Sequence, residues 1–377
     1  MAPDKFKGSL TAGDAAQAIQ RGVRGAVPKA VCKCCPMADG GEGTVDLFLE
    51  RGAAQKTARV RGPLGQPVEA AFALNGQTAI LEMASASGLG LLEESAYDPI
   101  HADTYGTGEL IAAAIGAGAK RLVIGIGGSA TCDAGTGMLR ALGVRFLNAH
   151  AEEIEGGVLA YEHLDSIDLT GLDERINDCD ISVAVDVDNP LCGRNGAART
   201  FAPQKGANPA QVALLDRALE HIADVSAQAL NRDYRDWPGA GAAGGLGFAL
   251  VAFLGAKLES GVRLIAREVG LEQMLAGSQL CLTGEGKIDE QTLHGKTVLG
   301  VGALAQAKKI PVIAFGGAVE EDAARELQLR GIEVKPIAPQ GTPSEESIRN
   351  AAEYLERAAQ DAVKRFVAAR SQPRAVQ

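Results

Sequence analysis

The last third of the chain alternates short apolar runs with amphipathic segments, and this alternation restricts the folds available to it. The predicted elements are a strand at 279–283, a helix at 298–307, a strand at 311–315, a helix at 322–330, a strand at 333–337 and a closing helix. Helices that connect successive strands in this way leave the strands parallel and joined by right-handed crossovers. The sequence therefore predicts an α/β fold with a parallel sheet.

The first two thirds of the chain carry similar signals. A hairpin is predicted around Asn75-Gly76, because this dipeptide favours a tight turn between two strands. The closing helix is predicted to begin with a capping box at Thr342-Pro343-Ser344-Glu345. Further strands are predicted at 30–37, 121–126 and 181–187, and further helices at 44–50, 108–115, 135–142, 209–230 and 245–254.

Composition narrows the class of protein. A chain of 377 residues that is 46% hydrophobic is long enough for two domains. The net charge of −10 and the lack of a basic stripe argue against a nucleic-acid binder. No apolar run is long enough to span a bilayer, and no secretion signal is recognised. The seven cysteines lack disulfide or zinc spacing, so we expect reduced thiols in a cytoplasmic protein.

Residues 283–297 form the densest candidate ligand loop. They follow the apolar run Leu280-Cys281-Leu282, and a loop at the carboxyl end of a strand is where α/β proteins bind ligands. Gly284 and Gly286 would let the backbone approach a ligand. Gly295-Lys296-Thr297 resembles the end of a P-loop, but Glu290 stands where the first glycine is required, so this is not a Walker A loop.

A pair of carboxylates follows the strand predicted at 181–187. Asp186 and Asp188 are two residues apart, which places both on one face of an extended chain. They suit magnesium, or one metal ligand and one base for a substrate hydroxyl. The alternative is a turn in which Asp188 caps Asn189-Pro190.

Two glycine strings resemble nucleotide-binding fingerprints. Residues 125–130 read Gly-Ile-Gly-Gly-Ser-Ala between a predicted strand and a helix, the context for phosphate binding at a helix N-terminus. Residues 239–244 read Gly-Ala-Gly-Ala-Ala-Gly, and Glu259 follows about twenty residues on. No strand precedes this second string, so we interpret it as a tight entry to a helix.

Short segments rich in glycine, aspartate or lysine recur along the chain. In order they are Pro3–Leu10, Ala38–Thr44, Gly125–Thr131, Asp186–Leu191, Phe201–Ala207 and Gly239–Gly245. With residues 283–297 they closely resemble the bacterial glycerate kinase family over nearly the whole chain. The resemblance implies an enzyme that uses ATP and Mg²⁺ to phosphorylate glycerate, usually at its 2-hydroxyl. It also implies a flavodoxin-like parallel-sheet domain formed by both chain ends, 1–60 plus 278–377, with a second α/β domain, 61–277, inserted.

The loops and the resemblance together nominate the site residues. Asp186, Asp188 and Lys296 are the catalytic candidates, and the two aspartates with Asp289 are the candidate magnesium ligands. For Asp39, an N-terminal cap of a helix explains the residue equally well. The candidates for substrate binding are Lys7, Ser9, Asp39 and Lys205, and those for ATP binding are Gly127, Gly128, Ser129, Thr131, Gly284 and Gly286.

Three alternatives stay open from the sequence. The acceptor is the 3-hydroxyl of glycerate instead of the 2-hydroxyl, the protein is an NAD(P)-dependent oxidoreductase of a small hydroxy acid, or it binds a nucleotide without catalysis. Family members have apolar residues ahead of Ala2-Pro3-Asp4, where this sequence has only Met1. We therefore expect an apolar segment upstream that completes the first strand. The stereospecificity and the oligomeric state are not indicated.

Overall fold

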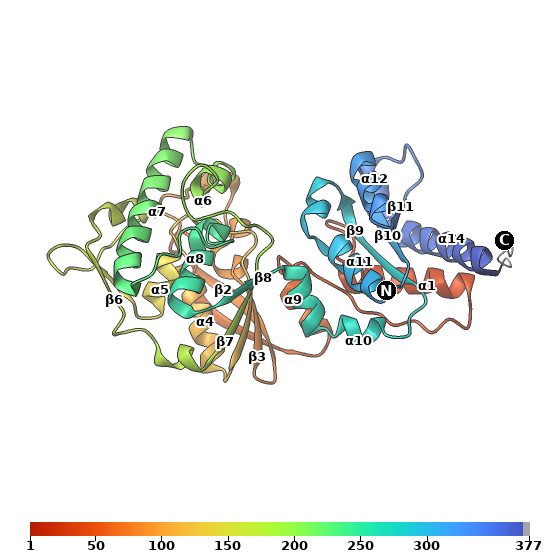
Figure 1. Ribbon diagram of the computed structural model, residues 1–377, viewed down its shortest axis with the longest axis horizontal. Helices are drawn as coiled ribbons and strands as arrows, with labels where there is room; N and C mark the ends of the chain where they lie inside the picture. Colours follow the sequence, from red (N-terminus) through yellow and green to blue (C-terminus); the bar gives the residue numbers. More distant parts are fainter. Residues whose placement is uncertain (372–377) are drawn as a thin grey trace. The chain divides into compact units, whose positions relative to one another are not determined.

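The computed structural model describes residues 1–371 and has a mixed α/β architecture (Figure 1). Contacts between residues divide the chain into two compact units. The terminal unit comprises Met1–Asp39 with Val262–Gln377, and the inserted unit comprises Gly40–Gly261. These boundaries differ from the predicted ones at 60 and 278, because residues 40–60 join the inserted unit and residues 262–277 join the terminal unit.

The terminal unit is built on a parallel sheet. Strands β9 (Cys281–Ile288), β10 (Val312–Val319) and β11 (Ile332–Pro336) lie in the order β11-β10-β9. Helices α11 (Thr297–Ala307) and α12 (Glu321–Leu329) connect them, as the alternation in the sequence predicts. Parallel sheets in α/β proteins have apolar side chains on both faces, and helices cover both of those faces.

Two extended N-terminal segments continue this sheet beyond β9. Residues 1–4 lie between β9 and residues 33–37, and backbone hydrogen bonds on both sides hold them there. The N–H groups of Ala2 and Asp4 donate to Leu282 and Gly284 at 2.7 and 2.9 Å, while those of Cys35 and Met37 donate to Met1 and Pro3 at 2.8 Å. The spatial order is thus 2-1-3-4-5, the order of flavodoxin-like sheets.

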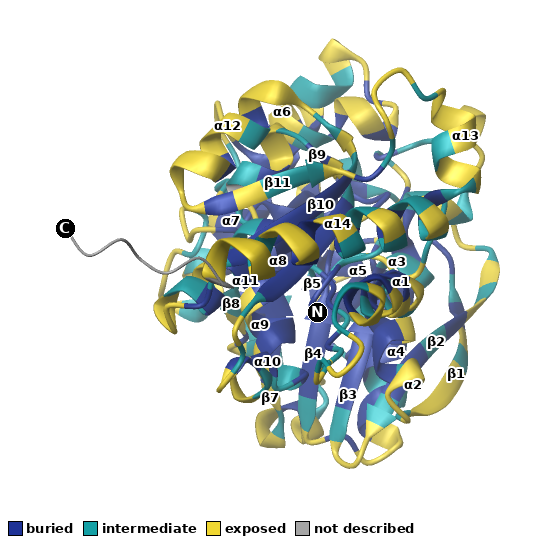
Figure 2. Cartoon of the chain, turned by 90° about the vertical axis from the view of Figure 1, so that its right-hand side faces the viewer, coloured by how far each residue is buried: buried dark blue, intermediate teal, exposed yellow. Residues whose placement is uncertain are grey.

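The two ends of the terminal unit also meet through helices. Helix α1 (Ala12–Ala26) packs along α14 (Ala351–Ser371), whose buried and exposed residues alternate along its length (Figure 2). A Cβ built at Gly22 would lie 2.2 Å from the backbone oxygen of Glu356, so the helices approach closely there. The predicted capping box is wrong: α13 (Ser344–Arg349) has Pro343 at its N-cap, and the Thr342 hydroxyl donates to Pro339 instead.

The inserted unit contains a six-stranded mixed sheet in the order β1-β2-β3-β4-β7-β8. Strand β2 pairs antiparallel with both β1 and β3, whereas the pairs β3–β4, β4–β7 and β7–β8 are parallel. The bounds are β1 Ala54–Arg61, β2 Pro67–Asn75, β3 Thr78–Glu82, β4 Arg121–Gly125, β7 Asp180–Ala184 and β8 Lys257–Glu259. The predicted hairpin at Asn75-Gly76 is the β2–β3 connection.

Specific contacts explain where the unit boundaries fall. Strand β1 pairs with β2 along its whole length, from Ala54 opposite Leu74 to Arg61 opposite Pro67, so residues before 60 belong to the inserted unit. At the other boundary, a Cβ at Gly300 of α11 would lie 2.5 Å from the Val262 side chain. Val262 therefore packs within the terminal unit.

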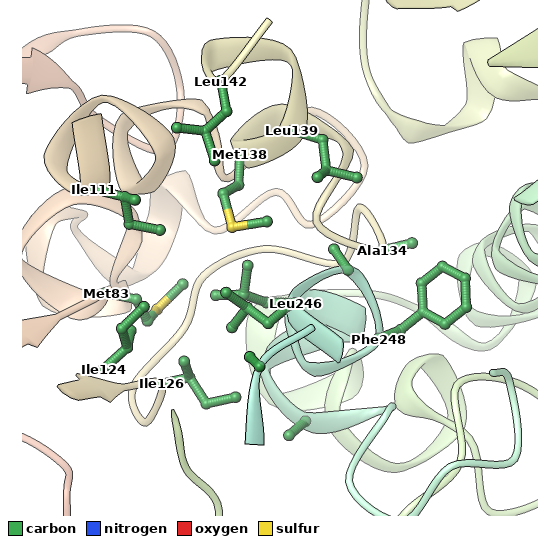
Figure 3. Close-up of a cluster of buried hydrophobic side chains, with 14 of the residues drawn as sticks. Met83, Ile111, Ile124, Ile126, Ala134, Met138, Leu139, Leu142, Leu246 and Phe248 are labelled. Carbon is green, nitrogen blue, oxygen red and sulfur yellow. The ribbon is translucent and has the colours of Figure 1, made fainter. Parts of the chain in front are cut away.

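A continuous apolar core fills the inserted unit between its sheet and helices. Figure 3 shows Met83, Ile124, Ile126, Met138 and Leu246 among its side chains, all buried. The helices that supply it include α4 (Tyr105–Gly116), α5 (Thr136–Ala141), α7 (Pro209–Leu230) and α8 (Ala242–Leu254). This unit also contains α2 Thr44–Glu50, α3 Ala84–Ser87, α6 Ala197–Phe201 and a small pair of strands, β5 Arg145–Leu147 and β6 Ser166–Asp168. Helices α9 Gly261–Glu268 and α10 Leu271–Leu275 follow it and belong to the terminal unit from Val262 on.

Within residues 1–371, no helix combines the length and the apolar character that crossing a membrane requires.

We predict that Gly22→Ala destabilises the terminal unit, since the new methyl group would meet the backbone of α14. The expected cost is about 1–3 kcal/mol, measured as a lower midpoint in urea or heat. Gly116→Ala is the control, because a Cβ there has no neighbour within 4 Å. Gly116→Ala should leave the stability unchanged or raise it by at most about 1 kcal/mol. Equal effects of the two substitutions would contradict the close helix contact.

Candidate functional site

The first candidate site residue lies where the extended segment 1–4 ends in the terminal unit. The Asp4 carboxylate accepts a hydrogen bond from the N–H of Lys5 at 2.7 Å and another from the hydroxyl of Thr297, the first residue of α11. Burial raises the pKa of Asp4 to about 6, with the nearby Asp39 carboxylate adding to the effect. Asp4 is thus a carboxyl group that titrates near neutral pH.

Glu285 of β9 is a second carboxyl group in the same unit. Its side chain is buried, and Oε1 accepts a hydrogen bond from the Thr292 hydroxyl at 2.6 Å. Burial raises the pKa of Glu285 to about 7, and the negative charges of Asp4 and Asp39 raise it further while Lys296 opposes them. We call Asp4, Asp39 and Glu285 the carboxylate cluster. Burial and neighbouring negative charges raise the pKa of a carboxyl group. A carboxyl group of this cluster can therefore exchange a proton with a hydroxyl near neutral pH.

Strand β9 continues through residues that the sequence analysis placed in a loop. It runs to Ile288, so Gly284 and Gly286 are strand residues. A Cβ at Gly284 would lie 2.5 Å from the backbone oxygen of Phe315, and one at Gly286 would lie 2.8 Å from the backbone nitrogen of Lys7. The structure therefore gives these glycines a packing role, which replaces the predicted loop conformation.

The actual loop after β9 holds Asp289 and Lys296. Asp289 caps the 3₁₀ helix Glu290–His294, with Oδ1 accepting from the N–H of Gln291 at 3.0 Å and Oδ2 lying 3.2 Å from the Lys287 ammonium. These contacts favour a capping role for Asp289. The half-buried Lys296 donates to Oε1 of Gln291 at 2.7 Å, and its charge acts on Glu285.

Lys7 and Ser9 lie in the turn that follows Asp4. Phe6 and Leu10 pair across this turn, and the Ser9 hydroxyl donates to the Phe6 carbonyl at 3.0 Å. Lys7 is exposed. The structure thus brings the two residues into the same short segment as Asp4, which the sequence analysis did not select.

In the inserted unit, the glycine-rich turn after β4 is the main candidate. Gly127 and Gly128 are exposed, whereas Ser129 and Thr131 are buried. Lys205 reaches this turn from a separate 3₁₀ helix, Pro203–Lys205, and is itself buried. Its ammonium donates to Ser129 Oγ at 2.6 Å and to the Thr131 carbonyl at 2.7 Å. Burial lowers the pKa of Lys205 to about 8.

Asp186 and Asp188 lie beyond the end of β7. The strand stops at Ala184, so the predicted strand to residue 187 is too long, and both aspartates are exposed on the following loop. Oδ1 of Asp186 accepts a hydrogen bond from the N–H of Gly261 at 3.0 Å, which fixes the start of that loop. The pair therefore presents carboxylates to solvent at the carboxyl edge of the sheet.

Asp133 is a buried acid that the sequence analysis missed. It accepts from the backbone N–H groups of Thr104, Gly135 and Gly137 and from the Thr104 hydroxyl, at 2.8–3.1 Å. Burial raises its pKa. These donors lie at the beginnings of α4 and α5, so the carboxylate ties two helix starts together.

Within the described part of the chain, no group of three or more histidine, cysteine, aspartate or glutamate side chains could hold a metal ion.

We predict that Glu285→Gln removes part of the loss of stability that the protein shows as pH rises. Glutamate has a pKa of about 4.5 when unfolded and about 7 here, so the folded state binds more protons between these values and its stability falls through this window. The difference is worth about 3 kcal/mol at most, and Gln keeps the oxygen that accepts from Thr292. Denaturation midpoints at pH 4.5 and pH 8 measure it.

The exposed Glu290→Gln is the matched control and should follow the wild-type pH dependence. If Glu285→Gln lost as much stability as the wild type between pH 4.5 and pH 8, the proton of Glu285 would not be held in the folded state.

Comparison with known proteins bears on the whole chain. The family model described as "Glycerate kinase family" matches residues 1–367. A "Glycerate kinase" of Bacillus subtilis (strain 168) is 46% identical over 96% of this chain and 95% of its own, and a "Glycerate 2-kinase" of Escherichia coli (strain K12) is 47% identical over 85% of both. A solved structure described as a candidate glycerate kinase 2 from Salmonella typhimurium LT2 covers 98% of both chains, with 41% identity and a TM-score of 0.89. The chain belongs to the glycerate kinase family.

Proposed function

We propose that this protein is a kinase that transfers the γ-phosphoryl group of ATP to the 2-hydroxyl of glycerate, giving 2-phosphoglycerate. The observation that carries the proposal is the family match over residues 1–367. The choice of the 2-hydroxyl is supported by the Escherichia coli relative, whose name specifies a 2-kinase. Transfer to the 3-hydroxyl is the alternative.

The chemistry makes limited demands on side chains. Phosphoryl transfer depends on positioning and on neutralising the charge spread over the phosphate oxygens, and the attacking hydroxyl must lose a proton. We propose Asp186 or Asp188 as the group that takes this proton. Lys296 would hold a phosphate oxygen, and its ammonium is already fixed by Gln291.

The carboxylate cluster offers a second proton acceptor in the terminal unit. Glu285 has a pKa of about 7, close to the value that suits a general base at neutral pH. Asp4 and Asp39 act on it through their charges. Asp39 of this cluster and Lys7 and Ser9 in the turn after Asp4 remain our candidates for binding glycerate.

Magnesium fits the donors that the chain presents. Mg²⁺ is usually held by one or two carboxylates together with phosphate oxygens and water. Asp186 and Asp188 are exposed carboxylates two residues apart, and Oδ1 of Asp186 also accepts from Gly261. Asp289 remains a candidate, and its oxygens contact Gln291 and Lys287. When bound, the ion would neutralise charge on the phosphate oxygens.

The family match argues against the oxidoreductase alternative. It rested on two glycine strings, and the structure uses both for close backbone packing. A Cβ at Gly125 would lie 1.9 Å from the Gly40 oxygen, and one at Gly244 would lie 2.0 Å from the Thr131 oxygen. Gly127 and Gly128 stay exposed and remain candidates for contact with ATP phosphates, whereas Gly284 and Gly286 pack within β9.

The proposal names ATP and glycerate as the small molecules that the protein binds. We also propose that it works in the cytoplasm, where ATP is available and where its seven cysteines would stay reduced.

Phosphorus NMR of the protein incubated with D-glycerate, ATP and magnesium tests the reaction directly. We expect ADP and a phosphate ester on carbon 2, which phosphorus–proton coupling distinguishes from an ester on carbon 3. An ester on carbon 3 would select the alternative. ATP binding without any ester would sink the proposed reaction.

Substitution of the exposed carboxylates tests their proposed roles. Asp186→Asn keeps the oxygen that accepts from Gly261, so the loop should persist while kcat falls about a hundredfold or more. Asp188→Asn should behave similarly. In the same assay Lys296→Met should raise the KM for ATP more than that for glycerate. Near-normal turnover of both aspartate variants would return the pair to a turn-forming role.

A further inference from the structure

The contacts of Lys205 indicate a task other than direct contact with a ligand. The side chain is only 2% exposed, and its ammonium is committed to Ser129 Oγ at 2.6 Å and the Thr131 carbonyl at 2.7 Å. Both acceptors belong to one short segment, the turn after β4. Lys205 thus fixes this turn from a separate part of the chain, more than 70 residues away in sequence.

The bond from Lys205 decides where the proton of Ser129 points. An ammonium group only donates hydrogen bonds, so Ser129 Oγ must be the acceptor in this pair. The Ser129 proton is then directed elsewhere, and no acceptor for it is found among residues 1–371. The hydroxyl is therefore an available donor beside the exposed Gly127 and Gly128.

Thr131 gives a second, independent sign of a missing partner. Its Oγ1 is fully buried and has no hydrogen-bond partner in the described part of the chain. Buried polar atoms without partners are rare, and each calls for an explanation such as a bound molecule. Two hydroxyl groups on one turn thus have unused hydrogen-bonding capacity, two residues apart.

The electrostatics of the turn favour a negatively charged partner. The carboxylate whose charge acts on Lys205 is Asp133, whereas burial raises the pKa of the neighbouring Cys132 thiol to about 12 and so leaves it uncharged near neutral pH. Asp133 is occupied by donors at the starts of α4 and α5, so no carboxylate bonds directly to the ammonium. A buried positive charge without such a partner is costly, and an anion bound at the turn would reduce that cost.

The backbone of the turn is held on other sides as well. Ser129 pairs with Gly88, and the Ala130 N–H donates to the Ser87 carbonyl at 2.9 Å. Gly244 contacts the Thr131 oxygen so closely that a Cβ there would lie 2.0 Å away. The turn is therefore rigid before any ligand arrives, which is the condition for precise hydrogen bonding to a substrate.

We propose that Lys205 is a positioning residue that orients the Ser129 hydroxyl as a donor to an anionic oxygen of a substrate bound at residues 127–131. The inference rests on the proposed function, which supplies two sources of that oxygen, a phosphate of ATP and the carboxylate of glycerate. Lys205 acts through Ser129 and does not itself touch the substrate. Its role therefore differs from that of a lysine that binds phosphate directly.

A double-mutant cycle with Ser129→Ala and Lys205→Met separates these roles. If Lys205 acts through Ser129, each single variant raises the KM for the same substrate by about ten- to a hundredfold, the worth of one charge-assisted hydrogen bond. The double variant is then no worse than the poorer single variant. A rise in the KM for ATP identifies a phosphate, and a rise in that for glycerate identifies the carboxylate.

Two further variants serve as a conservative replacement and as a control. Lys205→Gln keeps N–H donors without the charge and should restore part of the wild-type KM, even if Lys205→Met does not fold. Lys257→Met makes the same change at an exposed lysine of this unit, which pairs with Asp180 at 2.9 Å, and should leave both KM values unchanged.

Effects that add in the double variant, or wild-type KM values in Ser129→Ala, would overturn the inference. Failure of the wild type to phosphorylate glycerate is a different result, because it removes the proposed function. In that case the double-mutant cycle is evaluated from the dissociation constants of ATP and of D-glycerate, measured by calorimetry on the same variants. Wild-type affinity of Ser129→Ala for both compounds would then overturn the role of Lys205.

Discussion

Backbone pairing on both sides of residues 1–4 is the interaction on which the terminal unit depends. The segment hydrogen-bonds to β9 on one side and to residues 33–37 on the other, and so joins the two ends of the chain in one sheet. Because parallel strands end at the same edge, this pairing also brings Asp4 to the edge where α11 begins. The hydrogen bond from Thr297 to Asp4 is a direct result. The carboxylate cluster is therefore a product of the sheet's topology.

The two units treat buried charge in different ways. The terminal unit gathers carboxylates, and burial with the neighbouring negative charges raises the pKa of Asp4 to about 6 and that of Glu285 to about 7. The inserted unit buries one ammonium against neutral oxygens, and desolvation there favours the uncharged amine. In both units the surroundings shift the pKa of an ionisable group towards neutral pH, as is common at functional sites. The net charge of −10 repels anionic substrates, so local hydrogen-bond donors such as the Ser129 hydroxyl must oppose that repulsion.

Sequence patterns predicted elements well wherever a local signal was strong. Helix α7 matches its prediction at both ends. Asn208 and Gln211 form a capping box at its start, and Asn231 in the left-handed conformation ends it. The full extent of β9 was missed because two glycines, which have low strand propensity, lie inside it. Strand β1 was missed because most of its residues are exposed, so it shows no apolar alternation.

The candidate site was harder to predict for a related reason. Motif order identified the family and most of the loops, but burial is not visible in a sequence. Asp4 and Glu285 stood in the quoted segments without being selected, and only the structure shows them buried with raised pKa values. Lys205 was selected as a substrate ligand, whereas its burial against Ser129 suggests an indirect role. Contacts far apart in sequence carry this information, and local patterns do not.

The division of the terminal unit between the two chain ends has a consequence for synthesis on the ribosome. Residues Met1–Asp39 emerge before the inserted unit, Gly40–Gly261, whereas their sheet partner β9 and helix partner α14 emerge after it. At roughly 5–20 residues per second, translating that insert takes about 10–45 s. The inserted unit can fold in this interval, while the N-terminal segment and the apolar face of α1 must wait without their partners. The protein is thus completed from the middle outwards.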